Sequence, residues 1–184
     1  MTISFSSQSA RAAAALIVVL SLAIVPAGCR RHRRVTVQTI EDAPPLASVV
    51  ATADPHAGKQ LVSGFYGIEQ NAWRWTAGRF SVLLRPPRMA AANGAVLQLK
   101  FAVPDGVLAK MKSVSLSAYV NGTALTPETY TQAGQFIYSR DVPSSLLAGD
   151  VARVDFSLDK TVPPSAADRR ELGVVVSLIG FQPK

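Results

Sequence analysis

The chain has 184 residues, 48% of them hydrophobic, and a formal net charge of +7, which is enough chain for one domain with appendages. The excess charge is concentrated in Arg30–Arg34, because the residues from 35 onward contain 14 Lys and Arg against 12 Asp and Glu. The remaining chain therefore lacks the basic excess of a nucleic-acid-binding domain, and the pI of 10.0 does not indicate that function.

The N-terminal segment has the pattern of a secretion signal. A predominantly apolar run of 14 residues, Ala12–Val25, is followed by the small residues Ala27 and Gly28 and then by the only cysteine, Cys29. This run is short for a helix that crosses a hydrocarbon layer of about 30 Å. Residues 1–29 resemble the lipobox signal of bacterial lipoproteins, with Pro26 at the position where that family prefers leucine.

The resemblance implies that Cys29 carries the membrane anchor. It implies cleavage after Gly28, diacylglyceryl attachment to the Cys29 thiol and acylation of the new amino terminus, and more than one acyl chain holds a protein firmly. Arg30 stands where an aspartate retains enteric lipoproteins in the inner membrane, so the resemblance favours the outer membrane, facing the periplasm or the cell surface. The alternative is an ordinary signal peptide or a short anchor helix with an incidental cysteine.

The residues after Cys29 are expected to form a basic, extended tether over residues 29–58. Its arginines would lie at the lipid surface, where each favours anionic headgroups by about 1 kcal/mol. These arginines are Arg30, Arg31, Arg33 and Arg34. A solvated linker is the alternative for the same cluster. Three prolines and no helical period indicate an extended spacer, with room for a short strand at Ala47–Ala51.

From residue 59 onward, polar and apolar residues alternate in short runs separated by turn residues. The expected strands are Leu61–Ile68, Ala72–Thr76, Phe80–Leu84, Ala95–Val103, Ser113–Val120, Thr123–Leu125, Gln135–Arg140, Val151–Leu158 and Leu172–Ile179. Asn121-Gly122 predicts a type I′ hairpin turn, and Asn93-Gly94 predicts a second turn. Leu172–Ile179 is apolar on both faces, which indicates a central strand. About eight strands at this spacing predict an all-β fold for residues 59–184, a jelly-roll-like antiparallel β-sandwich.

The residue types that carry common catalytic and metal chemistry are scarce in this region. Both histidines, His32 and His56, lie outside the expected sandwich, so a Ser-His site and a zinc site of His and Cys ligands are not predicted. No Gly-x-Ser-x-Gly elbow and no phosphate-binding glycine loop occur. The spacing of the carboxylates does not pair any two of them. We expect no enzyme, metal or cofactor, and an envelope hydrolase is the least favoured reading.

Two stretches could instead hold a ligand. Gly64–Glu69 is followed by Trp73-Arg74-Trp75, and in a strand both indoles share one face, where they could stack on sugar rings. The alternative reading, favoured by the frequency of buried aromatic residues in such cores, makes both tryptophans core anchors. The second stretch, Pro163–Gly173, brings four consecutive charges to the last strand. These charges are either solvated or form ion pairs that pin the loop.

Together these two stretches resemble accessory β-sandwich modules of bacterial glycosyltransferases and other envelope-glycan proteins, of the galactose-binding, jelly-roll type. The likeness covers roughly residues 61–181 and includes the Tyr119–Gly122 hairpin. A glycan role implied by it would rest on Tyr66, Glu69, Trp73, Arg74, Trp75, Asp168, Arg169 and Glu171. We therefore expect a lipoprotein that binds glycan or associates with polysaccharide-assembly machinery. The alternative is a structural or protein-interaction lipoprotein, and exposure of the tryptophans would separate the two.

Overall fold

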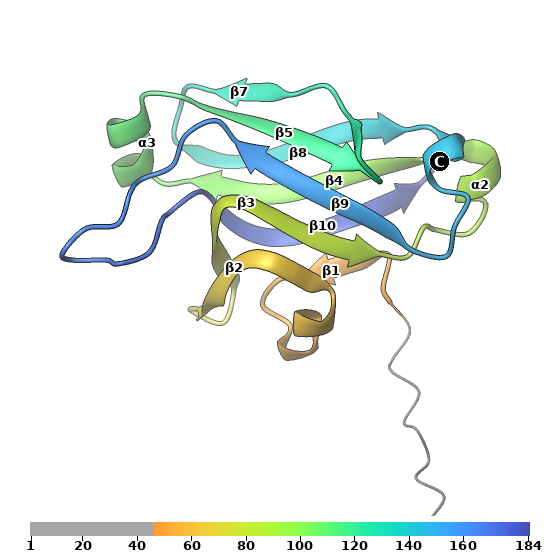
Figure 1. Cartoon of the computed structure of the whole chain (residues 1–184), viewed down its shortest axis with the longest axis horizontal. Helices are drawn as coiled ribbons and strands as arrows, with labels where there is room; N and C mark the ends of the chain where they lie inside the picture. Colours follow the sequence, from red (N-terminus) through yellow and green to blue (C-terminus); the bar gives the residue numbers. More distant parts are fainter. Residues whose placement is uncertain (1–45) are drawn as a thin grey trace, which may run out of the picture. The chain divides into compact units, whose positions relative to one another are not determined.

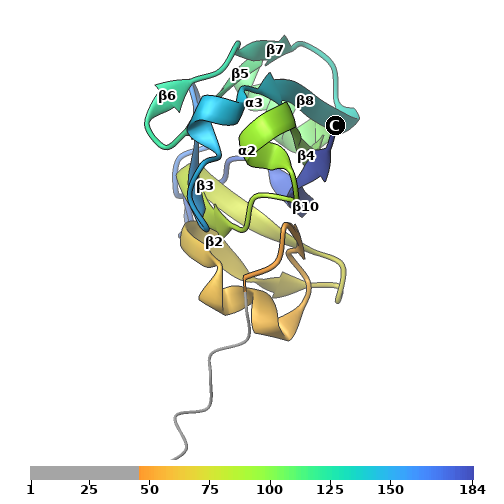
Figure 2. The same cartoon turned by 90° about the vertical axis from the view of Figure 1, so that its right-hand side faces the viewer.

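Alternating side chains along the strands build the hydrophobic core of this protein. The computed structural model describes residues 46–184, shown in Figures 1 and 2, so the signal segment, Cys29 and the arginine cluster lie outside the described residues. In Phe80–Leu84, Ala95–Val103, Val114–Val120 and Ala152–Leu158, every second residue is apolar and buried. None of the helices in the described part of the chain has the length and hydropathy needed to span a bilayer.

Ten strands form a single antiparallel sheet that curls on itself. The strands are β1 (Val49–Ala51), β2 (Leu61–Glu69), β3 (Trp73–Leu84), β4 (Ala95–Val103), β5 (Val114–Val120), β6 (Thr123–Ala124), β7 (Glu128–Tyr130), β8 (Gly134–Val142), β9 (Ala152–Leu158) and β10 (Val175–Pro183). Short helices are α2 (Ala90–Asn93) and α3 (Asp105–Met111), with 3-10 turns η1 (Pro55–Lys59) and η2 (Ser144–Leu146). The strand order is β6-β5-β9-β3-β10-β4-β8, with β2 beside β3, β1 beside β10 and β7 beside β5.

Strand β3 belongs to both halves of the curled sheet. Its first residues, Trp73–Thr76, lie beside the start of β10, whereas Arg79–Leu84 pair with β9. The two halves meet through the core, where the Phe101 ring of β4 packs edge-on against Tyr130 of β7 at 5.0 Å. The predicted antiparallel, jelly-roll-like β-sandwich is confirmed, with β4, β10 and β8 in one layer and β5, β9 and β3 in the other.

The turn that precedes Trp73 determines how this residue is presented. Gln70 and Asn71 have φ values of 50° and 54°, in the left-handed region, and the Ala72 amide donates to the Glu69 carbonyl at 3.1 Å, which closes a tight turn. Glu69 and Trp73 are register partners across this turn, with side chains on the same face of the β2–β3 hairpin.

Several predicted boundaries differ from those observed. The expected strands Ala72–Thr76 and Phe80–Leu84 are one continuous strand, β3, which pairs with β2 over most of its length, with β10 at its start and with β9 from Arg79 onward. Asn121-Gly122 forms the expected turn, with φ values of 49° and 84°, whereas Asn93-Gly94 ends the helical turn α2 instead of joining two strands. The central strand β10 begins at Val175 and runs to Pro183.

Helix α3 and strand β7 were not predicted from the sequence, and strand β1 lies outside the range predicted for the sandwich. Helix α3 gives a weak signal because only Val107 and Met111 of its seven residues are buried. Strand β7 has three residues, too few for a period to be recognised. Strand β1 confirms the short strand expected within Ala47–Ala51, and because it pairs with β10 it belongs to the sandwich although it lies in the expected tether, 29–58.

Candidate functional site

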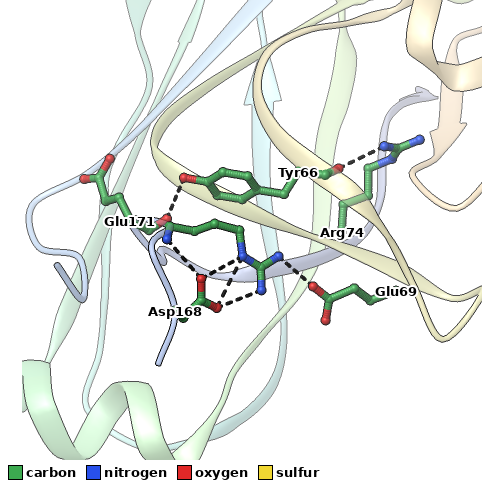
Figure 3. A network of polar contacts seen from close by, with 6 residues as sticks. Tyr66, Glu69, Arg74, Asp168 and Glu171 are labelled. Carbon is green, nitrogen blue, oxygen red and sulfur yellow. Dashed lines mark hydrogen bonds and ion pairs between the residues drawn. The ribbon is translucent and has the colours of Figure 1, made fainter. Parts of the chain in front are cut away.

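Arg170 is the centre of a polar network between the loop before β10 and the β2–β3 hairpin. Its guanidinium binds the Asp168 carboxylate through Nε at 3.0 Å and Nη2 at 2.8 Å, and donates from Nη1 to Glu69 Oε1 at 2.7 Å. These two carboxylates and Arg170, with Tyr66, are called the Arg170 cluster below (Figure 3). Its charged side chains are about one third exposed. The ion pairs therefore pin the loop to the hairpin, as one of the two sequence readings expected.

Tyr66 and Glu171 complete the attachment of the loop. The Tyr66 hydroxyl donates to the Glu171 carbonyl at 2.8 Å, and the Arg170 guanidinium carbon lies 5.3 Å from the Tyr66 ring centroid, within cation–π range. The Glu171 carboxylate accepts a hydrogen bond from the Thr161 hydroxyl at 2.7 Å, so it faces the start of the same loop. The polar atoms of these residues are thus directed at the protein itself.

Arg74 supports the backbone of two neighbouring elements. Its Nε donates to the Thr52 carbonyl at 2.7 Å and its Nη1 donates to the Tyr66 carbonyl at 2.9 Å. These bonds join the end of β1 to β2 (Figure 3 shows the bond to Tyr66). The Arg74 guanidinium therefore has a structural role, because it donates hydrogen bonds to two backbone carbonyls.

The cluster changes the acidity of Asp168. Hydrogen bonds from the Arg170 side chain and backbone amide lower the pKa of Asp168 from 3.8 to about 2. The stability that the ionised Asp168 carboxylate contributes to the fold is therefore fully present above about pH 4 and is lost as the pH falls through 2. The hydrogen bonds that the Arg170 guanidinium donates to the Asp168 and Glu69 carboxylates raise the pKa of Arg170.

Asp168→Asn is expected to destabilise the protein at pH 5 and to have a smaller effect at pH 2, because protonation weakens the same ion pair in the wild type. Urea unfolding midpoints measured at both pH values test this. Asp150→Asn, at an exposed carboxylate outside the cluster, is the control. An equal shift at the two pH values would contradict the assignment of this pKa effect to the cluster.

The two tryptophans have different environments. Both are half-buried, but Trp75 packs against the hydrophobic core, whereas Trp73 lines a groove of about 500 Å³ across the layer of β10, β4 and β8. This groove is called the Trp73 groove. Its wall includes Trp73, Lys100, Ala102, Gln135, Ile137, Val175 and Ser177. Trp75 therefore acts as a core anchor, as one of the two readings expected, and the role of Trp73 in ligand binding stays a prediction.

The structure sorts the eight predicted residues into separate places. Three of them, Tyr66, Glu69 and Asp168, converge around Arg170, which sequence reasoning did not select, and Glu171 joins through its backbone carbonyl. The Arg169 side chain is exposed, whereas the side chain of Arg170 is partly buried. In a run of four charges no periodic signal tells which arginine faces inward. The groove residues on β4 and β8 were also missed, because their proximity to Trp73 depends on strand order.

Comparisons with known proteins give a fold likeness only. No protein-family model and no curated protein sequence matches the chain. The CBM36-1 domain of a multidomain xylanase from the hindgut metagenome of Trinervitermes trinervoides is similar at 10% identity, TM-score 0.42, over 74% of this chain and 96% of that one. An acetyl xylan esterase, Est2A, from the rumen bacterium Butyrivibrio proteoclasticus is similar at 9% identity, TM-score 0.44, over 76% of this chain and 34% of that one.

A third structure, containing the CBM51-2 domain of Clostridium perfringens ZmpB in complex with GlcNAc, is similar at 12% identity and TM-score 0.35. The match covers 74% of this chain and 28% of that one. The chain therefore spans about a third or less of the esterase and ZmpB chains. At these identities and TM-scores, we transfer no residue role or ligand from any of the three.

Proposed function

We propose that this protein is a membrane-anchored lipoprotein of the bacterial cell envelope whose β-sandwich binds glycan without catalysis. The observation that carries the proposal is the half-buried Trp73 indole at the wall of an open groove with polar neighbours. Association with polysaccharide-assembly machinery, as the family resemblance implies, would bring the groove to its glycan.

The chemistry of the Trp73 groove suits a sugar chain. An indole face stacks on the apolar C–H face of a pyranose ring, and the exposed Ile137 and half-buried Val175 extend that apolar surface. Lys100 supplies ammonium donors, and the Gln135 amide both donates and accepts, as sugar hydroxyls require. A groove with an aromatic wall and a few polar groups is the usual composition of a small-molecule site.

The length of the groove favours an oligosaccharide over a single ring. Strands β3, β10, β4 and β8 are neighbours, so three strand spacings of about 4.8 Å separate the outer two by about 14 Å. Register places Val175 opposite Ala102, and Ala102 opposite Gln135, so these side chains form one continuous row across the face. A chain of sugars lying along this row would contact β10, β4 and β8, with Trp73 of β3 at the wall of the same groove.

Trp73→Ala is expected to weaken binding of the preferred glycan by at least about tenfold, which corresponds to the loss of one good aromatic stacking contact. The measurement is a glycan array with the full-length chain in detergent, followed by calorimetric titration of the best glycan. Val151→Ala, at an exposed apolar residue outside the groove, is the matched control. Binding of no glycan, or equal binding by Trp73→Ala, would refute the glycan proposal.

Cys29→Ala is expected to move the protein from the membrane fraction to the soluble fraction, because the thioether-linked diacylglyceryl group would be absent. Cell fractionation with and without detergent measures this. A variant with Gln at Arg30, Arg31, Arg33 and Arg34 keeps Cys29 and is expected to stay membrane-bound, with weaker attraction to anionic lipid. Retention of Cys29→Ala on the membrane would overturn the lipoprotein assignment.

A structural or protein-interaction lipoprotein is the second candidate. It is favoured by the Arg170 cluster, in which Glu69, Asp168 and Tyr66 satisfy internal partners. In that case the full-length chain would bind no glycan, while substitutions in the cluster would lower stability alone. The glycan array therefore separates the two candidates.

A further inference from the structure

The layer that does not contain the Trp73 groove has a hollow of its own. This hollow, of about 440 Å³, lies on β3, β9 and β5 and is here called the Arg79 hollow. The side chains that matter are Arg79, Ser81, Tyr119, Arg153, Asp155 and Ser157. None of them was selected from the sequence as a site residue.

Strand register explains why these side chains gather. Ser81 lies opposite Asp155, and Asp155 lies opposite Tyr119, so three strands contribute one row. Arg79 lies opposite Ser157 in the next row on the same face. The residues between the rows point the other way, because Phe80 and Phe156 are buried and stack at 4.9 Å. The rows therefore form one outward surface with hydroxyl groups between larger side chains.

One of the two arginines of the hollow is already paired. Arg153 Nε donates to both Asp155 oxygens, at 2.9 and 3.1 Å, and Arg153 Nη2 donates to the buried Ser81 hydroxyl at 3.2 Å. Ser81 also shares a 2.7 Å hydrogen bond with Ser63. These bonds hold Arg153 and Asp155 in place and leave little net charge on the pair.

Arg79 is the unpaired cation of the hollow. Its side chain is exposed, and within residues 46–184 no Asp or Glu oxygen lies within 4.0 Å of its guanidinium. The hollow therefore carries an excess of one positive charge. A guanidinium is planar and presents paired N–H donors, the geometry that a carboxylate accepts in a bidentate manner.

We propose that the Arg79 hollow binds a carboxylate-bearing sugar, such as a uronic acid unit of an acidic polysaccharide. Arg79 holds the carboxylate, and Tyr119, which is 36% exposed, offers its ring to the sugar face. The Ser157 hydroxyl and the outer lone pairs of Asp155 meet sugar hydroxyl donors. This site is separate from the Trp73 groove and does not require it.

The test uses the full-length chain in detergent and two ligands, a glucuronic-acid-containing oligosaccharide and the same oligosaccharide with its carboxyl groups reduced to alcohols. Calorimetric titration is expected to show that the wild type binds the acidic ligand at least about tenfold more tightly. Arg79→Gln is expected to remove this preference, and Arg79→Lys to keep part of it, because the ammonium retains the charge without the planar fork. Tyr119→Ala is expected to weaken the binding of both oligosaccharides.

Arg88→Gln is the matched control, because it removes the same net charge from an exposed arginine outside the hollow. It is expected to keep the acidic preference, and Trp73→Ala is expected to keep it also. Equal affinity of the wild type for the two ligands, or an unchanged preference in Arg79→Gln, would overturn the proposal. Loss of acidic binding in Trp73→Ala would also overturn it, by placing that ligand in the other groove. If neutral glycans do not bind while the acidic oligosaccharide still does, the proposal that the Trp73 groove binds glycan is refuted, and the proposal for the Arg79 hollow stands.

Discussion

Gly64→Ala is expected to lower the free energy of unfolding by about 3–5 kcal/mol, from left-handed backbone strain and overpacking together. Gly64 has φ +75°, and an added Cβ would lie 2.0 Å from the Arg79 carbonyl oxygen and 2.7 Å from the Phe80 Cα. Both of these neighbours are backbone atoms of β3, which cannot turn away as a flexible side chain can. The close approach occurs where the register between β2 and β3 shifts.

Gly67→Ala is the matched control for this position. It lies three residues further along the same strand, and an added Cβ there would meet no atom within 4 Å. We expect a change within about 0.5 kcal/mol for this variant, as for other surface substitutions. Urea unfolding of the two variants beside the wild type measures both effects. Equal stability of Gly64→Ala and Gly67→Ala would show that the close β2–β3 approach is unimportant.

Phe156→Ala is expected to cost about 3–5 kcal/mol, the range for deleting a buried aromatic ring. Phe156 is 2% exposed and stacks on Phe80 with ring centroids 4.9 Å apart and an interplanar angle of 16°. The Phe65 ring packs edge-on against Phe80 at 5.4 Å. The three rings therefore join β9, β3 and β2, and removal of the Phe156 ring leaves Phe80 without its stacking partner.

Thermal and urea unfolding measure the effect, with Phe156→Leu as the variant that retains most of the buried apolar volume. We expect Phe156→Leu to recover much of the stability lost in Phe156→Ala, because cavity size governs the cost. Since Phe156 lies beneath the Arg79 hollow, its loss is also expected to weaken ligand binding there. A loss below about 1 kcal/mol in Phe156→Ala would mean that the core relaxes to fill the cavity.

The strand content of the fold was predictable because burial follows local alternation. Leu97, Leu99 and Phe101 alternate with more exposed residues in the sequence, and all three are buried in β4. The Asn121-Gly122 turn was also predictable, since both residues tolerate positive φ. By contrast, β7 and α3 are short elements that depend on tertiary packing, and their local pattern is too weak to identify them.

The candidate sites were less predictable than the fold. The stretch containing Trp73 was recognised because both tryptophans of the chain occur together, with Arg74 between them. Arg170 was not selected, since its partner Glu69 is 101 residues away in the chain. Arg79 and Tyr119 were not selected for the same reason, because β3 and β5 become near neighbours only through β9 between them.

The amino-acid sequence by itself determined the class of fold, most strand positions and the expectation of a lipid anchor at Cys29. These features depend on local pattern: period-two burial, turn residues with positive φ, and an apolar run before a single cysteine. Only the tertiary structure decided that Trp73 lines a groove while Trp75 packs on the core, and that Arg170 pins the last loop. The physical reason is that strand order and register bring distant residues together, and neither is encoded in any short stretch of the chain.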